Sequence, residues 1–113
     1  MSLIIKSEND FHKFVLEEKD IFVVVYFFAQ WCGPCKMFSS VFESVCEEYQ
    51  TMSEDQKVKI YKIDIDNLSK ISADYGILSI PTFIIFRNGV ECARQIGIQE
   101  DFSDWVASNI INL

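Results

Sequence analysis

The chain has 113 residues, half of them hydrophobic and 14% aromatic, which fits one folded domain and argues against disorder. Its 17 acidic and 10 basic residues give a formal net charge of −7 at pH 7, so it would repel nucleic-acid phosphates and anionic lipid surfaces. We therefore expect a single domain over residues 1–113, with no nucleic-acid partner and no membrane partner.

The first half of the chain alternates between strand and helix patterns. Residues 3–6 predict a short apolar strand, and Ser7 is expected to cap the helix that follows. Residues 21–29 show no polar alternation, which is typical of a central strand covered by helices on both faces. From Met37 to Tyr49, apolar residues recur at steps of three and four, which predicts a long amphipathic helix.

The pattern continues after residue 57 with another strand and a short helix. Residues 58–65 alternate and predict a strand. Asn67 is expected to cap the next helix, which Gly76 closes. Residues 82–86 are apolar throughout and predict a further strand.

The last quarter of the chain predicts a hairpin and a final helix. Asn88 and Gly89 are typical of a two-residue turn, so residues 90–96 are expected to return antiparallel to the preceding strand. Glu100 and Asp101 favour a helix start. The predicted fold class is therefore α/β, with three layers in which helices cover both faces of a mixed sheet.

The ends of the chain carry no recognisable targeting signal. Residues 1–8 lack a basic leader, and the last residues form no retention or peroxisomal address. The longest apolar run, 21–29, is far shorter than the roughly 20 residues of a membrane helix. We expect a cytoplasmic protein, and in that reducing compartment a close cysteine pair is more often redox-active or metal-binding than structural.

The sequence Cys32-Gly33-Pro34-Cys35 lies between the central strand and the long helix. At a helix start, residues three apart have Cα atoms about 5 Å apart, which suits a disulfide. The free amides and positive dipole end stabilise a thiolate on Cys32, whereas Cys35 is expected to be more buried and less acidic. Gly33 leaves room for a partner chain, and Pro34 loses no hydrogen bond in the first turn.

These differences assign a role to each cysteine. The Cys32 thiolate attacks a disulfide of another protein, and Cys35 then resolves the mixed disulfide. The predicted function is protein dithiol–disulfide exchange without a cofactor. Other interpretations remain open: a zinc site completed by Cys46, Cys92 or His12, a metal or cluster shared by two chains, or a turn with two incidental cysteines.

The motif and several later segments resemble the thioredoxin family. The segment from Ala29 to Met37 is similar to the family's active-site segment, and the rest of the match follows in the family's order and spacing, at Tyr75–Ile77, Ile80–Phe83, Phe86–Gly89 and Gly97. The resemblance covers essentially the whole chain. It implies a five-stranded mixed sheet flanked by four helices, disulfide-containing protein substrates, and recharging by an NADPH-dependent thioredoxin reductase.

The resemblance also implies roles for residues beside the cysteine pair. The Ile80–Pro81 bond corresponds to the family's cis-proline, where the Ile80 backbone would pair with an extended substrate chain. The alternative is that Pro81 is only the first residue of a strand. Lys62 aligns with a family lysine near the redox pair, although a solvated strand lysine is the alternative.

Trp31 is expected to belong to an exposed contact patch rather than to the core, because its amphipathic ring suits interfaces. Ile80, Gly97 and Ile98 would complete this substrate-binding surface. Cys92 is interpreted as an unreactive strand thiol, with glutathionylation or an intermolecular disulfide as the alternative.

Tyr26 is a departure from the family pattern, because the family usually has a buried aspartate at this position. That aspartate is thought to help the resolving cysteine lose its proton. A tyrosine, with an ordinary pKa of about 10, is a poor base near neutrality. We therefore expect Cys35 to resolve mixed disulfides more slowly, or at more alkaline pH, than in a typical member.

Tyr26 also keeps a second class of function open. The chain could be a binding module of the same fold that docks on a partner through Trp31, Ile80 and Gly97, with its redox chemistry secondary. An oxidase or isomerase-like member is a further alternative, but it would need an oxidising compartment. The sequence favours a monomeric disulfide reductase.

Overall fold

The computed structural model describes residues 3–51, 58–98 and 101–111. The described residues form one alternating series of strands and helices. Helix α1 continues directly into a π-helical segment, η1, at His12–Leu16. The elements are β1 Leu3–Ile4, α1 Glu8–Phe11, β2 Phe22–Phe28, α2 Gly33–Thr51, β3 Val58–Asp64, α3 Ser69–Asp74, β4 Thr82–Arg87, β5 Val90–Ile96 and α4 Phe102–Ile111.

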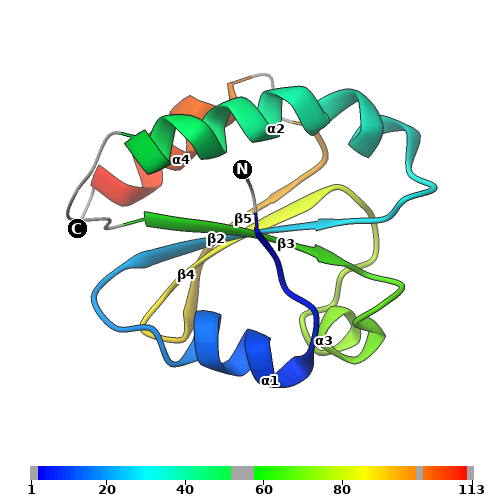
Figure 1. Ribbon diagram of the computed structural model, residues 1–113, viewed down its shortest axis with the longest axis horizontal. Coiled ribbons are helices and arrows are strands. Elements are labelled where there is room, and N and C mark those ends of the chain that lie inside the picture. The colour runs from blue at the N-terminus through cyan, green and yellow to red at the C-terminus, as the bar shows by residue number, and fades with distance from the viewer. Residues whose placement is uncertain (1–2, 52–57, 99–100, 112–113) are drawn as a thin grey trace.

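The five strands form one mixed sheet in the order β1-β3-β2-β4-β5. β1, β3 and β2 are parallel, whereas β4 runs antiparallel to β2 and β5 antiparallel to β4. In Figure 1, α2 and α4 cover one face of the sheet and α1 and α3 cover the other. The predicted three-layer architecture is confirmed.

The burial of both faces of strand β2 explains why residues Phe22–Phe28 include no charged side chain. Val24 and Tyr26 belong to the hydrophobic cluster that includes residues of α2 and α4, and Val25 and Phe27 belong to the cluster that includes residues of α1 and α3. Successive side chains of a strand point to opposite faces, so a strand buried on both sides must be apolar at every position. This double burial fixes the strand that leads into the cysteine motif.

Asn67 does not cap α3, so that prediction is wrong. The N-cap residue is Leu68, which makes no side-chain capping hydrogen bond, and the helix begins at Ser69. The Asp64 carboxylate accepts the Asp66 N–H at 2.9 Å, and the Asp64 carbonyl accepts the N–H groups of Asn67 and Leu68, each at 3.1 Å. This turn places Asn67 one residue before the cap position.

The other predicted helix boundaries and turns mostly agree with the structure. Ser7 accepts the Asp10 N–H at 3.0 Å and caps α1 as predicted. Gly76, after α3, and Gly89, in the β4–β5 turn, have φ angles of 62° and 78°, which glycine adopts without strain. The expected role of Glu100 in starting α4 lies outside the described residues.

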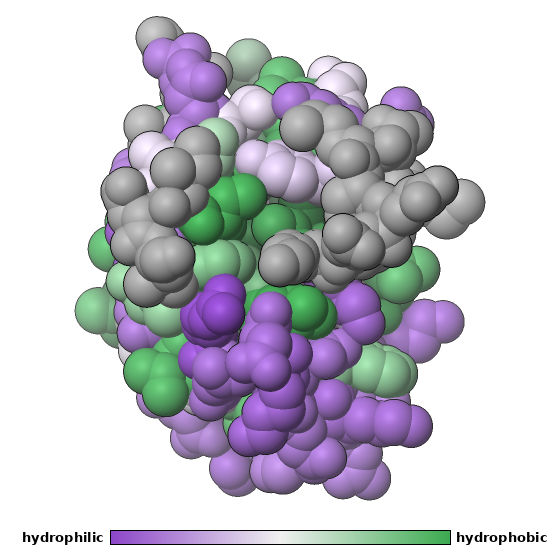
Figure 2. Space-filling model, turned by 90° about the vertical axis from the view of Figure 1, so that its left-hand side faces the viewer, coloured by the Kyte–Doolittle hydropathy of each residue, from purple (hydrophilic) through white to green (hydrophobic). Residues whose placement is uncertain are grey.

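The face of the molecule at the C-terminal end of α2 has a hydrophobic centre. Figure 2 shows hydrophobic side chains in the middle of this face and hydrophilic ones over its lower part, at the level of α1.

None of the helices in the described residues has the length and hydrophobicity needed to span a membrane.

Candidate active site at the start of helix α2

The cysteine pair lies where β2 ends and α2 begins. The Cys32 N–H donates to the Ala29 carbonyl at 3.2 Å, and the Cys32 carbonyl accepts the Lys36 N–H at 3.1 Å, so Cys32 directly precedes the first helical residue, Gly33. Cys32 and Cys35 form a disulfide bond, and their Cα atoms are 5.2 Å apart. The Cys35 N–H also donates to Cys32 Sγ at 3.2 Å. The predicted pairing across the first turn is confirmed.

The two cysteines are almost equally buried. Cys32 is 4% exposed and Cys35 is 3% exposed, so in the oxidised protein Cys35 is more buried than Cys32 by only a small margin. The disulfide draws both side chains into the same hydrophobic cluster. Gly33 has open space where a Cβ would lie, and Pro34 follows it in the first turn of α2. A partner chain therefore has room to come close to the backbone at Gly33.

Trp31 lies on the surface beside the disulfide. Its side chain is 66% exposed, so it is not a core residue. The indole N–H donates to the Asp66 carboxylate at 2.8 Å, which fixes the ring over the loop that follows β3. Asp66 was not predicted from the sequence, because no pattern relates it to Trp31, which lies far away in the chain.

The loop before β4 forms the other wall of the site. The Ile80–Pro81 peptide bond is cis, as the resemblance implied. The Gly97 N–H donates to the Pro81 carbonyl at 2.8 Å, which joins the end of β5 to this loop. A pocket of about 240 Å³ lies between Trp31 and Ile80 and is also lined by Leu78.

Two of the exposed side chains that line this pocket, Trp31 and Leu78, are large and apolar, and the third is Ser79. Leu78 is 97% exposed and Ile98 is 45% exposed. Leu78 was not predicted from the sequence; a large apolar residue in the loop before the cis-proline was the signal that could have identified it. Together with Trp31, Ile80 and Gly97, these residues form what we call the apolar surface.

Tyr26 lies behind the disulfide, on the inner side of α2. It is 3% exposed, and its hydroxyl group donates to the Cys35 carbonyl oxygen at 3.4 Å. Burial raises the pKa of Tyr26 to about 12. The hydroxyl is therefore un-ionised near neutral pH and cannot act as a base for Cys35.

Lys62 lines the same inner pocket as Tyr26 and Cys35, which has a volume of about 430 Å³. Its Nζ atom is 3.7 Å from Glu43 Oε2 and 5.5 Å from the centre of the Phe28 ring. Lys62 is therefore not a free surface lysine. Glu43, the partner of Lys62, was not predicted from the sequence.

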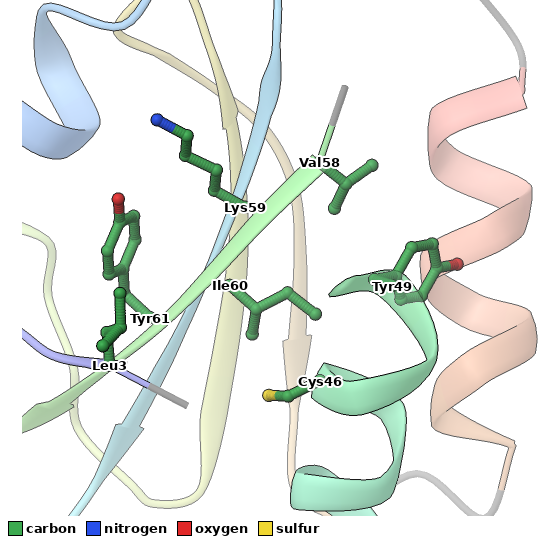
Figure 3. A pocket seen from close by; sticks show the side chains of 7 residues that line it. All are labelled: Leu3, Cys46, Tyr49, Val58, Lys59, Ile60 and Tyr61. Carbon is green, nitrogen blue, oxygen red and sulfur yellow. The ribbon is translucent and has the colours of Figure 1, made fainter. Parts of the chain in front are cut away.

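The remaining cysteines lie apart from the pair. Cys46 is 1% exposed on α2, and burial, the largest cause, raises its pKa to about 12, so it behaves as a small hydrophobic residue. Figure 3 shows Cys46 and Ile60 directed into the space between α2 and β3, where a third pocket, of about 190 Å³, lies. Cys92 is exposed on β5, and its thiol donates to the Val90 carbonyl at 3.5 Å.

The described residues contain no group of three or more His, Cys, Asp or Glu side chains arranged to hold a metal ion. The pair instead has the geometry of a redox centre. A disulfide on the first turn of a long helix, beside a cis-proline and under an exposed tryptophan, defines a thiol–disulfide oxidoreductase of the α/β class.

Similarity to known proteins assigns the chain to a family. The thioredoxin family model matches residues 2–108. The thioredoxin of Rickettsia felis is 40% identical over 106 residues, which are 92% of this chain and 95% of that protein. The thioredoxin of Chlamydia pneumoniae is 41% identical over 100 residues, 88% of each chain. The chain belongs to the thioredoxin family.

Solved structures agree with this assignment. The thioredoxin of Malassezia sympodialis superposes with a TM-score of 0.77 at 34% identity and covers 98% of this chain and 90% of its own. The thioredoxin of Fasciola hepatica gives a TM-score of 0.79 at 28% identity, with 96% of each chain covered. The protein is accordingly a dithiol–disulfide oxidoreductase of the thioredoxin type, with disulfides as substrates and a thioredoxin reductase as its general partner.

Proposed function

We propose that Cys32 is the nucleophile and Cys35 the resolving thiol in the reduction of protein disulfides. The observation that carries this assignment is the position of the disulfide across the start of α2, a helix of 19 residues. Once the pair is reduced, the free amides and the positive dipole end at this helix start stabilise a thiolate on Cys32. Cys35, inside the first turn, lies within bonding reach of the same sulfur.

The reaction then proceeds in two exchanges. The Cys32 thiolate attacks one sulfur of the substrate disulfide, which breaks as a Cys32–substrate bond forms and a substrate thiolate leaves. Cys35 loses its proton and attacks Cys32 Sγ, so that the Cys32–Cys35 bond forms and the second substrate thiolate leaves. Two electrons pass from the dithiol to the substrate, and solvent protons neutralise the released thiolates.

The apolar surface supports a role in binding the substrate chain. Trp31 and Ile80 line one pocket, and the Gly97 N–H donates to the Pro81 carbonyl. We expect the exposed side chain of Ile98, the residue after Gly97, to extend this surface. An extended segment with apolar side chains could pair with the Ile80 backbone and cover Leu78, which is almost fully exposed. We expect such segments, flanking a disulfide, to be preferred substrates.

Composition and family membership support the rest of the proposal. The protein acts as a monomeric single domain over residues 1–113 in the cytoplasm, without a cofactor of its own. An NADPH-dependent thioredoxin reductase returns the disulfide to the dithiol. Gly33 and Pro34 shape the turn that holds the cysteine pair. Tyr26 and Lys62, which line the inner pocket, influence the redox reactivity of the pair.

Replacing Cys35 by serine tests the two roles. The reduced Cys35→Ser variant, mixed with insulin, should accumulate a covalent adduct that dithiothreitol releases, because the second exchange is blocked. Mass spectrometry of the linked peptides should find the bond at Cys32. The matched control, in which both Cys32 and Cys35 are serine, should form no adduct. An adduct formed through Cys92, or none, would contradict the assignment.

A further inference from the structure

Among the residues that the structure describes, none that lines the inner pocket is a buried acid beside Cys35, the proposed resolving thiol. Tyr26, which occupies the pocket wall from β2, is un-ionised below the alkaline range because burial raises its pKa to about 12. The charged groups that line the pocket are Lys36 and Glu43 from α2 and Lys62 from β3. The Cys35 thiol, which lines the same pocket, must therefore ionise in the field of these three side chains.

Lys62 and Glu43 form a loose pair at this pocket. Their closest charged atoms are 3.7 Å apart, and the two side chains are 30% and 37% exposed. The Lys62 ammonium group also lies 5.5 Å from the centre of the Phe28 ring, so it is held between a carboxylate and an aromatic face. The carboxylate both offsets the positive charge and determines where the ammonium group lies.

Glu43 and Lys62 also influence the pKa of the Cys46 thiol, which lies further along α2 and outside the inner pocket. Burial is the largest cause of its raised pKa, and Glu43 raises this pKa further, as does Glu47, whereas Lys62 lowers it. Glu43 and Lys62 therefore act on a thiol of α2 with opposite signs. Cys35 lies in the pocket that these two side chains line.

We propose that Glu43 is a positioning residue that limits how strongly the Lys62 ammonium group stabilises the Cys35 thiolate. This inference rests on the proposed role of Cys35 as the resolving thiol. In that step the Cys35 proton passes to solvent, the thiolate attacks Cys32 Sγ, and the substrate leaves as a thiolate with the two electrons. With no internal base, the rate depends on the thiolate fraction of Cys35, which this pair sets.

The proposal predicts opposite effects for the two members of the pair. Glu43→Gln releases Lys62 toward the pocket and should lower the Cys35 pKa by about half a unit, which is about threefold in thiolate fraction at neutral pH. Lys62→Met should raise the Cys35 pKa by about one unit. Because a thiolate of lower pKa is less nucleophilic, the resolving rate of Glu43→Gln should rise by only about twofold.

The test is an NMR titration that needs no turnover. The Cβ chemical shift of Cys35 is followed against pH in the reduced Cys32→Ser background, with Glu43→Gln, Lys62→Met and both together. If Glu43 acts through Lys62, Glu43→Gln should lower the Cys35 pKa only when Lys62 is present. Glu43→Asp, which keeps the carboxylate, should return the pKa toward that of the background protein.

The matched control is Glu48→Gln, which removes the same charge from an exposed position of α2 outside the pocket and should leave the Cys35 pKa unchanged. An unchanged or raised Cys35 pKa in Glu43→Gln would overturn the proposal. So would an equal decrease with and without Lys62, because Glu43 would then act by its own field. A failure of the Cys35→Ser adduct experiment would instead contradict the redox roles, so the two failures are distinguishable.

Discussion

Replacement of Cys32 by serine is expected to abolish the dithiothreitol-driven reduction of insulin, so that only the rate of dithiothreitol alone remains. A serine hydroxyl does not ionise near neutral pH and cannot form the mixed disulfide that starts the reaction. The second exchange is lost with it. A thiol held in the position of Cys35 gains an effective concentration of about 10⁵ M or more over free thiols, and that advantage disappears.

The control for this experiment is Cys92→Ser, which removes an exposed thiol from β5 and leaves the site intact. It should reduce insulin at the unmodified rate. Turnover that survives in Cys32→Ser would show that another thiol carries the reaction. Partner binding without turnover in the unmodified protein would favour a binding module instead.

Replacement of Phe83 by alanine should give the largest loss of stability among single core changes, about 3–5 kcal/mol of unfolding free energy. Phe83 is fully buried on β4 and stacks on Tyr26, with ring centres 5.0 Å apart. It also contacts Phe38 of α2 at 5.3 Å and Phe102 of α4 at 4.8 Å. Its removal would leave a cavity under the helix that carries the cysteines.

Urea denaturation of the oxidised protein measures this loss as a shift of the midpoint. Leu78→Ala is the control, because a side chain that is 97% exposed should change stability by less than about 0.5 kcal/mol. A loss below about 1 kcal/mol for Phe83→Ala would mean that the aromatic cluster collapses into the space. Phe83 would then not be the residue that joins the sheet to α2 and α4.

Much of the fold follows from local patterns in the sequence. The uninterrupted apolar segment of β2, the three- and four-residue steps of α2 and the Asn88–Gly89 turn each reflect one physical requirement: double burial, a helical face, and positive φ angles. The start of α3 could not be predicted in this way. There, the Asp64 carboxylate orders the preceding turn, so the cap position falls on Leu68, which has no capping group.

The site was predictable where its residues are adjacent in sequence and not where they are distant. Cys32 and Cys35 share one helical turn, so their spacing alone fixes the disulfide geometry. The contact of Trp31 with Asp66 and that of Glu43 with Lys62 each join two segments that only the packed sheet brings together. Family resemblance indicated Lys62, but nothing in the sequence indicated its partner.

The most direct test is the order in which the four thiols of the reduced protein react with iodoacetamide at neutral pH, followed by peptide mass spectrometry. The helix start should ionise Cys32, so it should be alkylated well before Cys35, Cys46 and Cys92. Cys46 is buried and should react last. If the exposed thiol of Cys92 reacts first and Cys32 only at alkaline pH, α2 does not activate Cys32 and the proposed mechanism is wrong.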